Sequence, residues 1–271
     1  MDIGTAKITP EEMEGIPHYL IDELDPGDEF NVVKFQQYAK EYIRQIHEKG
    51  KIPILVGGTG FYIQAVLYDI DFTENDSHTS YREELEQLAK EKGEEYLHEM
   101  LKKVDPESAE VIHPNNKKRV IRALEYEKLT GDKISIHNAI QRDNESPYCF
   151  CYFVLNKNRA QLYETIDQRV DLMIQKGLLK EVKLLSERGY HRELVSMQGL
   201  GYKELLAFLE AETTLEEAII LLKRNTRHFA KRQLTWFKRE KKVIWVNKEE
   251  FTNDSEILTY LLKLLKDNNI T

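Results

Sequence analysis

The chain has 271 residues, with 39 Lys and Arg against 47 Asp and Glu, which gives a formal net charge of -8. Its length exceeds that of most single domains, so we expect two domains or one domain with an insertion. A hydrophobic content of 41% excludes a chain that is disordered throughout. No apolar run approaches the roughly 20 residues that cross a bilayer, and the first residues lack a signal-peptide profile. We therefore expect a cytoplasmic protein with no membrane segment.

The first predicted helix covers residues 31–50. Its apolar residues follow the i, i+3, i+4 spacing of an amphipathic helix, with Asn31 placed to cap it and Gly50 to end it. The next segment, KIPILVGGTGFYIQAVL (residues 51–67), predicts a short apolar strand, a glycine turn and an apolar helix. Helix, strand, turn and helix in this order are typical of a parallel α/β sheet that is covered on both faces.

The glycine turn, Gly57-Gly58-Thr59-Gly60, is the first candidate site. Ligands of parallel sheets bind at the carboxyl ends of strands, and glycines there let backbone N–H groups approach an anion. Thr59 adds a hydroxyl group. Many strand-to-helix turns nevertheless use glycine and bind nothing, so the motif by itself favours an ordinary turn.

Residues 75–140 are charged and helical in pattern, and predict a helical insertion domain between two parts of an α/β core, residues 1–74 and 141–271. Inside the insertion, four cations gather on the first turns of one helix: Lys117, Lys118, Arg119 and Arg122. Cations at a helix N-terminus oppose the helix dipole unless an anion lies nearby. A phosphate contact and a solvated face both remain open for this cluster.

The segment YCFCYFVLN (residues 148–156) predicts a strand of the core sheet. Cys149 and Cys151 would share one face of it, at a spacing too short for an ordinary disulfide, which favours two reduced thiols over a metal-binding pair. The following helix, residues 158–177, carries Arg169 beside its apolar stripe. Position alone favours a guanidinium that reaches out to solvent over one that points into a site.

A long helix is predicted from a capping box, Thr214 and Glu217, to about residue 240, and a strand follows at 241–247. One face should pack on the core: Ile219, Leu222, Phe229, Gln233, Trp236 and Phe237. The opposite face is a basic band: Lys223, Arg224, Arg227, His228, Lys231, Arg232 and Lys238. A concentration of cations on an acidic protein indicates a polyanionic partner, and its length favours nucleic acid.

Five segments together resemble the bacterial tRNA dimethylallyltransferases, also called tRNA isopentenyltransferases: IPHYLIDELDP, ILVGGTGFYIQAVL, NNKKRVIRALE, QGLGYKE and KRQLTWFKR. The resemblance runs along essentially the whole chain. It implies an α/β fold with a P-loop-NTPase-like parallel sheet flanked by helices, and an all-helical insertion domain. It also implies transfer of a dimethylallyl group from dimethylallyl diphosphate to N6 of the adenosine 3′-adjacent to the anticodon, with Mg²⁺. The expected partners are the tRNA anticodon stem-loop and dimethylallyl diphosphate, and we expect a monomer.

The resemblance also assigns residues. Thr59 would lie near the target base, and Arg169 would hold the diphosphate, which replaces the solvent-facing interpretation above. Positions that would contact tRNA are Arg82, Lys118, Arg119, Arg122, Gln198, Gly199, Gly201, Tyr202, Lys203, Lys231, Arg232, Gln233, Trp236 and Lys238. The position of Trp236 on the apolar face favours packing in the core over stacking on RNA. No metal ligand is assigned.

One departure concerns the start of the chain. Members of the family carry a first strand, a phosphate-binding loop and a Gly-Asp-Ser segment, whose Asp is the general base, before the block that reads MDIGTAK here (residues 1–7). We therefore expect these 271 residues alone to be inactive.

Three other functions fit parts of the pattern. A prenyltransferase that acts on free adenine nucleotides would share the core and need no basic band. A nucleotide kinase would share the sheet and the helical insertion. A catalytically inert RNA-binding fragment would share the band.

Overall fold

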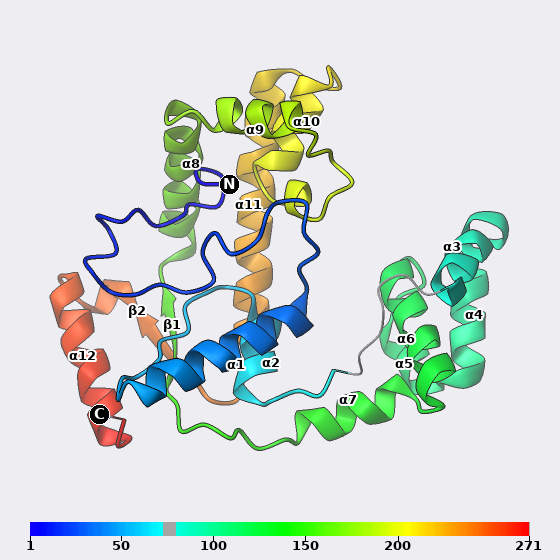
Figure 1. Ribbon diagram of the computed structural model, residues 1–271, viewed down its shortest axis with the longest axis horizontal. Coiled ribbons are helices and arrows are strands. Elements are labelled where there is room, and N and C mark those ends of the chain that lie inside the picture. Colours follow the sequence, from blue (N-terminus) through cyan, green and yellow to red (C-terminus); the bar gives the residue numbers. More distant parts are fainter. Residues whose placement is uncertain (73–79, 271) are drawn as a thin grey trace. The chain divides into compact units, whose positions relative to one another are not determined.

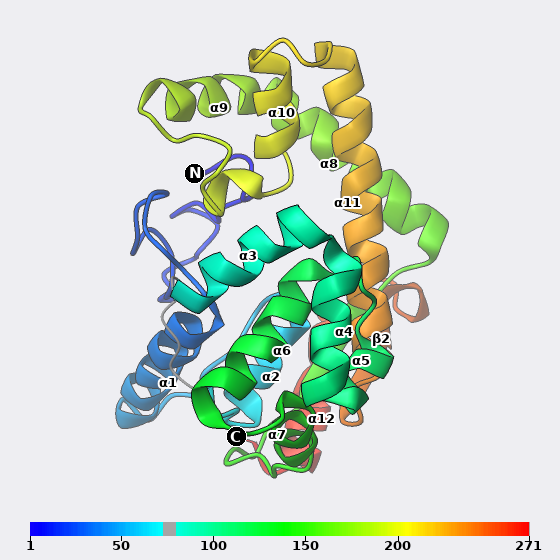
Figure 2. The ribbon, with the colours of Figure 1, turned by 90° about the vertical axis from the view of Figure 1, so that its right-hand side faces the viewer.

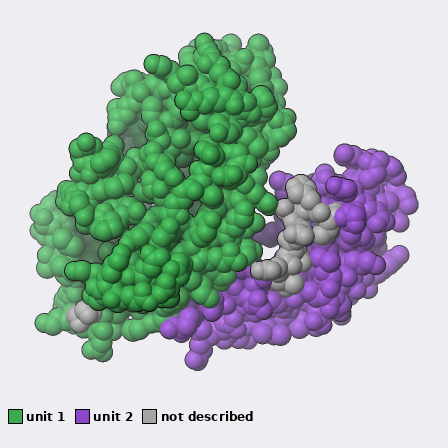
Figure 3. Space-filling view, in the orientation of Figure 1, with its two compact units in different colours: residues 1–66, 148–271 green, residues 67–147 purple. Residues whose placement is uncertain are grey.

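The computed structural model describes residues 1–72 and 80–270. The chain forms two compact units, one made of Met1–Val66 with Tyr148–Thr271 and the other of Leu67–Pro147 (Figure 3). The expected boundaries lay a few residues away, at 74/75 and 140/141. Helix α7, Ile134–Arg142, runs through the second of these and belongs as a whole to the Leu67–Pro147 unit.

The first unit is helix-rich around a small parallel sheet (Figure 1). Its elements are α1 (Val32–Glu48), α2 (Gly60–Leu67), β1 (Tyr152–Asn156), α8 (Arg159–Gln175), α9 (Leu178–Glu187), η1 (Ser196–Gln198), α10 (Tyr202–Leu209), α11 (Leu215–Phe237), β2 (Val243–Asn247), η2 (Lys248–Glu250) and α12 (Asp254–Asp267). The two strands pair in parallel, with Tyr152 opposite Val243 and Asn156 opposite Asn247. Both were predicted as strands, so the α/β class with parallel pairing is confirmed.

The strand expected at residues 51–56 is not a strand. Among the described residues the sheet has two strands, and neither pairs with this segment. Ile54 and Val56 are 83% and 86% exposed. A strand forms when a neighbour accepts and donates its backbone hydrogen bonds, so apolar alternation alone does not produce one.

The predicted helix starts are confirmed. The Asn31 side-chain oxygen accepts the N–H groups of Val33 at 3.0 Å and Lys34 at 3.1 Å, which caps α1. Thr214 and Glu217 form the capping box of α11. Helix α11 ends at Phe237, about three residues before the predicted end. Figures 1 and 2 show it running from α10 at one end toward α2 and β2 at the other.

The core of the first unit lies where α8, α9, α10 and α11 meet. Its fully buried residues include Leu178, Val182, Leu205, Ala218 and Leu222. This packing fixes α8 and α11 side by side, which matters because both helices carry predicted site residues. Among the described residues, no helix has the length and apolar character that crossing a membrane requires.

The second unit contains five described helices: α3 (Ser80–Lys92), α4 (Glu94–Val104), α5 (Pro106–Val111), α6 (Lys117–Thr130) and α7. The helical character predicted for this region is confirmed. Its core is made of buried apolar residues of α3, α4 and α6, including Leu85, Leu97 and Leu124. Asp105, fully buried, caps α5 and also accepts hydrogen bonds from the backbone and hydroxyl of Ser135 at 3.0 and 2.7 Å, which ties α7 to the bundle.

Candidate active site and nucleic-acid interface

The glycine turn is held by the far end of α11. The Gln233 side-chain amide donates a hydrogen bond to the Gly58 carbonyl at 3.0 Å. A Cβ atom on Gly58 would lie 2.0 Å from Gln233 Nε2, and one on Gly60 would lie 2.1 Å from Trp236 Cδ1. The rigid indole leaves no room for a side chain at Gly60, whereas a side chain at Gly58 would displace the flexible Gln233 amide and its hydrogen bond. This contact joins two of the segments that carried the resemblance, 175 residues apart in the chain.

Thr59 lies at the start of α2. Its carbonyl accepts the N–H groups of Tyr62 at 2.9 Å and Ile63 at 3.2 Å, which opens the helix. Its side chain is exposed. A helix N-terminus favours negative charge, so the Thr59 hydroxyl stands where an anion or a group that gains negative charge would be stabilised.

Arg169 lies on α8 and is exposed. Its neighbours on the same helix, Asp167 and Asp171, reach α11 and pair with two cations of the predicted basic band. Arg227 binds Asp167 at 2.5 Å, and Lys223 binds Asp171 at 2.6 Å. The sequence reading missed these two acids. Their i, i+4 spacing, which places them on one helix face, was the available signal.

The rest of the band faces solvent. Arg224, His228, Lys231, Arg232 and Lys238 are exposed. Residues i and i+2 of an α-helix are about 200° apart around the helix axis. Lys231 therefore lies nearly opposite Gln233, and Lys238 nearly opposite Trp236.

Helix α11 thus turns one face to the glycine turn and an almost opposite face to solvent. Gln233 and Trp236, assigned above to tRNA, lie on the face that contacts the turn. Trp236 is partly buried and packs against Gly60 and Phe61.

One residue of the expected core face is different. Phe229 is 37% exposed, and the Arg232 guanidinium carbon lies 5.6 Å from its ring centroid. The expectation of a core position for Phe229 was wrong, because α11 extends beyond the helices that cover its first half. An exposed ring beneath a guanidinium belongs to the cationic surface instead.

The QGLGYKE segment leads from η1 into α10, and its side chains divide between core and surface. Gln198 and Lys203 are exposed, and Gly199 is partly buried. Gly201, at φ +92°, donates its N–H to the Glu204 carboxylate at 2.8 Å. The exposed members stay candidates for RNA contact.

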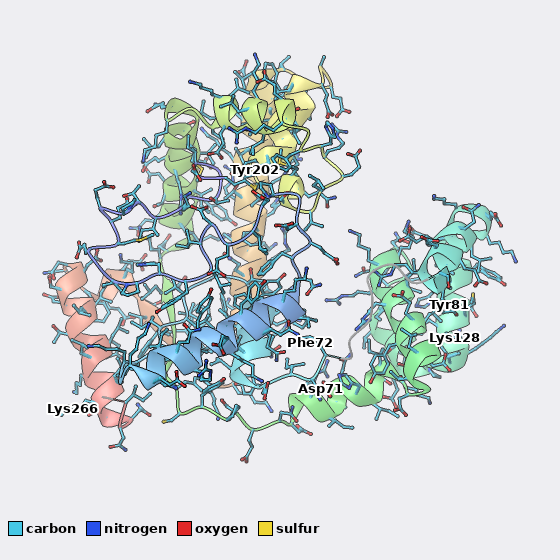
Figure 4. All side chains as sticks on the ribbon, viewed as in Figure 1. Asp71, Phe72, Tyr81, Lys128, Tyr202 and Lys266 are labelled. Carbon is cyan, nitrogen blue, oxygen red and sulfur yellow. The ribbon has the colours of Figure 1, made fainter. Side chains whose placement is uncertain are left out.

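Tyr202 does not face solvent. The residue, labelled in Figure 4, is 2% exposed. Its hydroxyl donates a hydrogen bond to the Glu181 carboxylate at 2.6 Å. Burial raises the pKa of this hydroxyl, and the Glu181 carboxylate raises it further. Glu181 also accepts the backbone N–H groups of residues 2–4, and Gly4 lies against the Tyr202 ring. Direct contact between the Tyr202 side chain and RNA is therefore corrected to a role in holding residues 2–4.

In the second unit, Lys118 and Arg119 are exposed on the first turn of α6. No acidic residue lies in that turn, and Asn116 gives no side-chain cap. The start of α6 therefore combines uncapped N–H groups with two cations, and both features attract phosphate.

Arg82 and Arg122 belong to a different environment of the same unit. Arg82 binds the carboxylate of Glu125 with Nε at 3.0 Å and Nη2 at 2.5 Å, and the Glu125 side chain is 2% exposed. Burial lowers the pKa of the Arg122 guanidinium, and the charge of Glu125 opposes this shift. Glu125 was missed by the sequence reading. The Arg82 guanidinium forms an ion pair with a buried carboxylate. This ion pair competes with the contact to RNA that was expected of Arg82.

Metal ligation was tested on the same residues. Within residues 1–72 and 80–270, no three His, Cys, Asp or Glu side chains converge where they could hold a metal ion. Cys149 and Cys151 are both free, as expected for reduced thiols.

Comparison with known proteins gives one consistent answer. A family model described as IPP transferase matches residues 1–240. The chain is 66% identical to a tRNA dimethylallyltransferase of Lachnoclostridium phytofermentans over 100% of this chain and 86% of the relative. It is 50% identical to a protein of the same name from Acetivibrio thermocellus over 96% and 83%.

Solved structures agree. A tRNA isopentenylpyrophosphate transferase from Bacillus halodurans is 44% identical, with a TM-score of 0.71 over 99% of this chain and 85% of that one. A eukaryotic dimethylallyltransferase acting on tRNA is 30% identical, with a TM-score of 0.77 over 90% and 63%. The likenesses confirm the predicted P-loop-like α/β class.

Proposed function

Because the chain belongs to the IPP transferase family, we propose that it transfers a dimethylallyl group from dimethylallyl diphosphate to N6 of the adenosine 3′-adjacent to the tRNA anticodon. The observation that carries the proposal is 66% identity along the whole chain to a protein named tRNA dimethylallyltransferase. The geometry supports it, because α11 joins the Thr59 turn to an exposed cationic face suited to RNA.

The reaction makes one bond and breaks one. The N6 lone pair attacks C1 of the dimethylallyl group, the C1–O bond breaks, and its electron pair leaves with the diphosphate while N6 loses a proton to a base. An adenine amino group is a weak nucleophile, so orientation and stabilisation of the leaving charge supply most of the rate. Arg169 supplies positive charge to the diphosphate, and Thr59 orients the adenine.

The tRNA is held by its backbone. Lys231, Arg232 and Lys238 on α11 and Lys118 and Arg119 on α6 are exposed cations of the two clusters. Taking the target base out of its stack costs a few kcal/mol, and contacts to the opened loop supply this energy. Gln198 and Lys203 are exposed in the segment that the family resemblance assigns to the same loop.

Mg²⁺ is part of the proposal on family resemblance alone. It would neutralise charge on the diphosphate. The described residues present no assembled ligand set, so no step is derived through the ion. A cytoplasmic location and a monomeric state are proposals of the same kind.

The test is group transfer with labelled dimethylallyl diphosphate, using the complete protein with either unmodified tRNA or AMP. Label in tRNA supports the proposal. Label in AMP alone would show a nucleotide prenyltransferase, and phosphate transfer between nucleotides would show a kinase.

Arg169→Ala tests the division of roles. We expect turnover to fall roughly 100-fold, because a cation on the leaving group is lost, with tRNA affinity unchanged. Arg159→Ala is the matched control, since Arg159 is an exposed arginine of the same helix that stacks on Tyr163. Equal losses in both variants would contradict the role of Arg169.

A further inference from the structure

Three side chains at the end of α11 and just beyond it form a stripe along the glycine turn and α2. Gln233 and Trp236, spaced i and i+3, lie on one side of α11, and Glu240 follows three residues after the helix ends at Phe237. They meet the glycine turn and α2 in the same order, at Gly58, Gly60 and Gln64. We propose that this stripe is a latch that positions the Thr59 turn for the reaction, so that Gln233 and Trp236 are positioning residues and not contacts to RNA. The inference rests on the proposed function and adds to it.

The first contact of the latch fixes a peptide plane. The Gln233 amide donates to the Gly58 carbonyl, and the other end of that same planar peptide is the N–H of Thr59. Holding the carbonyl therefore sets the direction in which the Thr59 backbone leaves the turn. A misplacement of about 1 Å in a reacting geometry costs about 100-fold in rate, so a constraint one residue away is kinetically relevant.

The second contact fixes the start of α2. Gly60 is buried, and the edge of the Trp236 indole occupies the space that a side chain would need there. Phe61 meets the same indole edge-on, with ring centroids 6.3 Å apart. A rigid aromatic ring therefore sets the distance between α11 and the first turn of α2.

The third contact uses the one acid of the basic stretch at residues 226–242. Glu240, just beyond α11, accepts a hydrogen bond from Gln64 at 3.1 Å and is partly buried. Burial raises the pKa of its carboxyl, and the neighbouring Trp236 side chain and the Gln64 hydrogen bond limit the rise. Glu240 thus braces α2 instead of neutralising the exposed cations of α11.

Two cations of the band, Lys231 and Lys238, lie almost opposite the latch residues Gln233 and Trp236 around α11. Lys231 and Lys238 are exposed, while Gln233 and Trp236 contact the turn. Binding of RNA and placement of Thr59 are then separate tasks of one rigid element. Loss of the latch should lower turnover and leave tRNA affinity intact, which is the reverse of what loss of the cations should do.

The test is a double-mutant cycle in the complete protein, with Gln233→Leu, Gly58→Ala and the pair. Gln233→Leu removes the donor, and Gly58→Ala pushes a methyl group into the space of the Gln233 amide. We expect each single variant to lower kcat roughly 10- to 100-fold with tRNA Kd unchanged. We expect the pair to be no worse than the poorer single variant, because both act on one contact.

Thr235→Ala is the matched control. Thr235 is exposed two residues from Gln233, and its hydroxyl bonds only within α11, to the Lys231 carbonyl at 2.9 Å. We expect its kcat and Kd to equal those of the unaltered protein. Additive losses in the cycle, or a loss of tRNA affinity with kcat kept, would overturn the latch. Thermal unfolding of each variant separates these effects from a loss of folding.

Amide hydrogen exchange gives a measurement that needs no activity. The N–H groups of Tyr62 and Ile63 bond to the Thr59 carbonyl, so their exchange reports on the turn. We expect Gln233→Leu to speed exchange at both positions and Thr235→Ala to leave it unchanged. Unchanged exchange in Gln233→Leu would overturn the latch even if the enzyme modifies tRNA. Faster exchange in a protein that fails to modify tRNA would keep the latch and reject the proposed function.

Discussion

The cations of α11 and those of the second unit form different kinds of ion pair. On α11, Lys223 and Arg227 pair at the surface with acids of α8. In the second unit, Arg82 pairs with Glu125, whose side chain is 2% exposed. Each cluster keeps other cations, such as Lys231 and Lys118, in solvent.

The difference shows that a cluster of cations in a sequence is not one surface. Acidic side chains on a neighbouring helix form ion pairs with some of the cations. The remaining cations stay exposed to solvent, where they can bind a ligand. Ion pairs at the surface add little to the free energy of unfolding. A buried carboxylate that loses its cation is left uncompensated, and this destabilises the fold. Arg82 therefore serves mainly the fold of its unit, while Lys231 and Arg232 are available for phosphate.

The largest effect is expected from Arg82→Ala. Removing the guanidinium leaves the buried Glu125 carboxylate with less compensation, and we expect the second unit to lose about 3 kcal/mol of unfolding free energy. Urea unfolding followed by circular dichroism measures it. Lys118→Ala, at an exposed position of the same unit, should leave the midpoint unchanged. A similar shift in both variants would break the comparison.

The next effect concerns tRNA. Reversing Lys231 and Arg232 to Glu should weaken tRNA binding roughly 10- to 100-fold and lower the salt slope by about one for each lost phosphate contact. Filter binding over a salt series gives both quantities. Lys223→Ala removes a cation that already has a carboxylate partner, and it should keep the affinity and the slope. An equal loss of tRNA affinity in both variants would mean that the ion pairs with α8 do not separate the RNA-binding cations of the band from the others.

A smaller effect is expected in stability from the surface pair itself. Lys223→Ala should cost about 0.2–1 kcal/mol, because the pair with Asp171 is partly exposed and screened by salt. A cycle with Asp171→Ala measures the coupling directly. A coupling as large as the Arg82 effect would show that both clusters are built in the same way.

The smallest effect is at Glu240. Burial raises the pKa of its carboxyl. A raised pKa favours the folded state while the group is protonated, and this contribution is lost as the pH rises through the folded pKa. Glu240→Gln should therefore unfold at a slightly higher temperature than the unaltered protein at pH 7. The two should coincide below about pH 4, where both side chains are neutral. A difference in unfolding temperature that stays constant at all pH values would show that ionisation of Glu240 is not its cause.

Much of the secondary structure could be predicted from local signals. Asn31 and the Thr214–Glu217 box mark helix starts because caps satisfy backbone groups within a few residues. The segment at 51–56 shows where such signals fail. Its apolar pattern fits a strand, yet among the described residues no strand pairs with it.

The site residues likewise fall into those that the sequence could predict and those that it could not. Thr59, Arg169 and the exposed cations could be proposed from residue type, spacing and the family resemblance. Asp167, Asp171 and Glu125 could not be found, because their role depends on which helix packs beside them. The same holds for Tyr202. The family resemblance assigned it to tRNA contact, but the fold buries it against Glu181.

By itself, the sequence determined where helices start, which residues carry charge and which family the segments resemble, because these depend on neighbours in the chain. The tertiary structure decided which cations remain in solvent and why Gly60 must be glycine. Both follow from contacts across many residues, where the packing of α8 and α11 sets distances that no local pattern records.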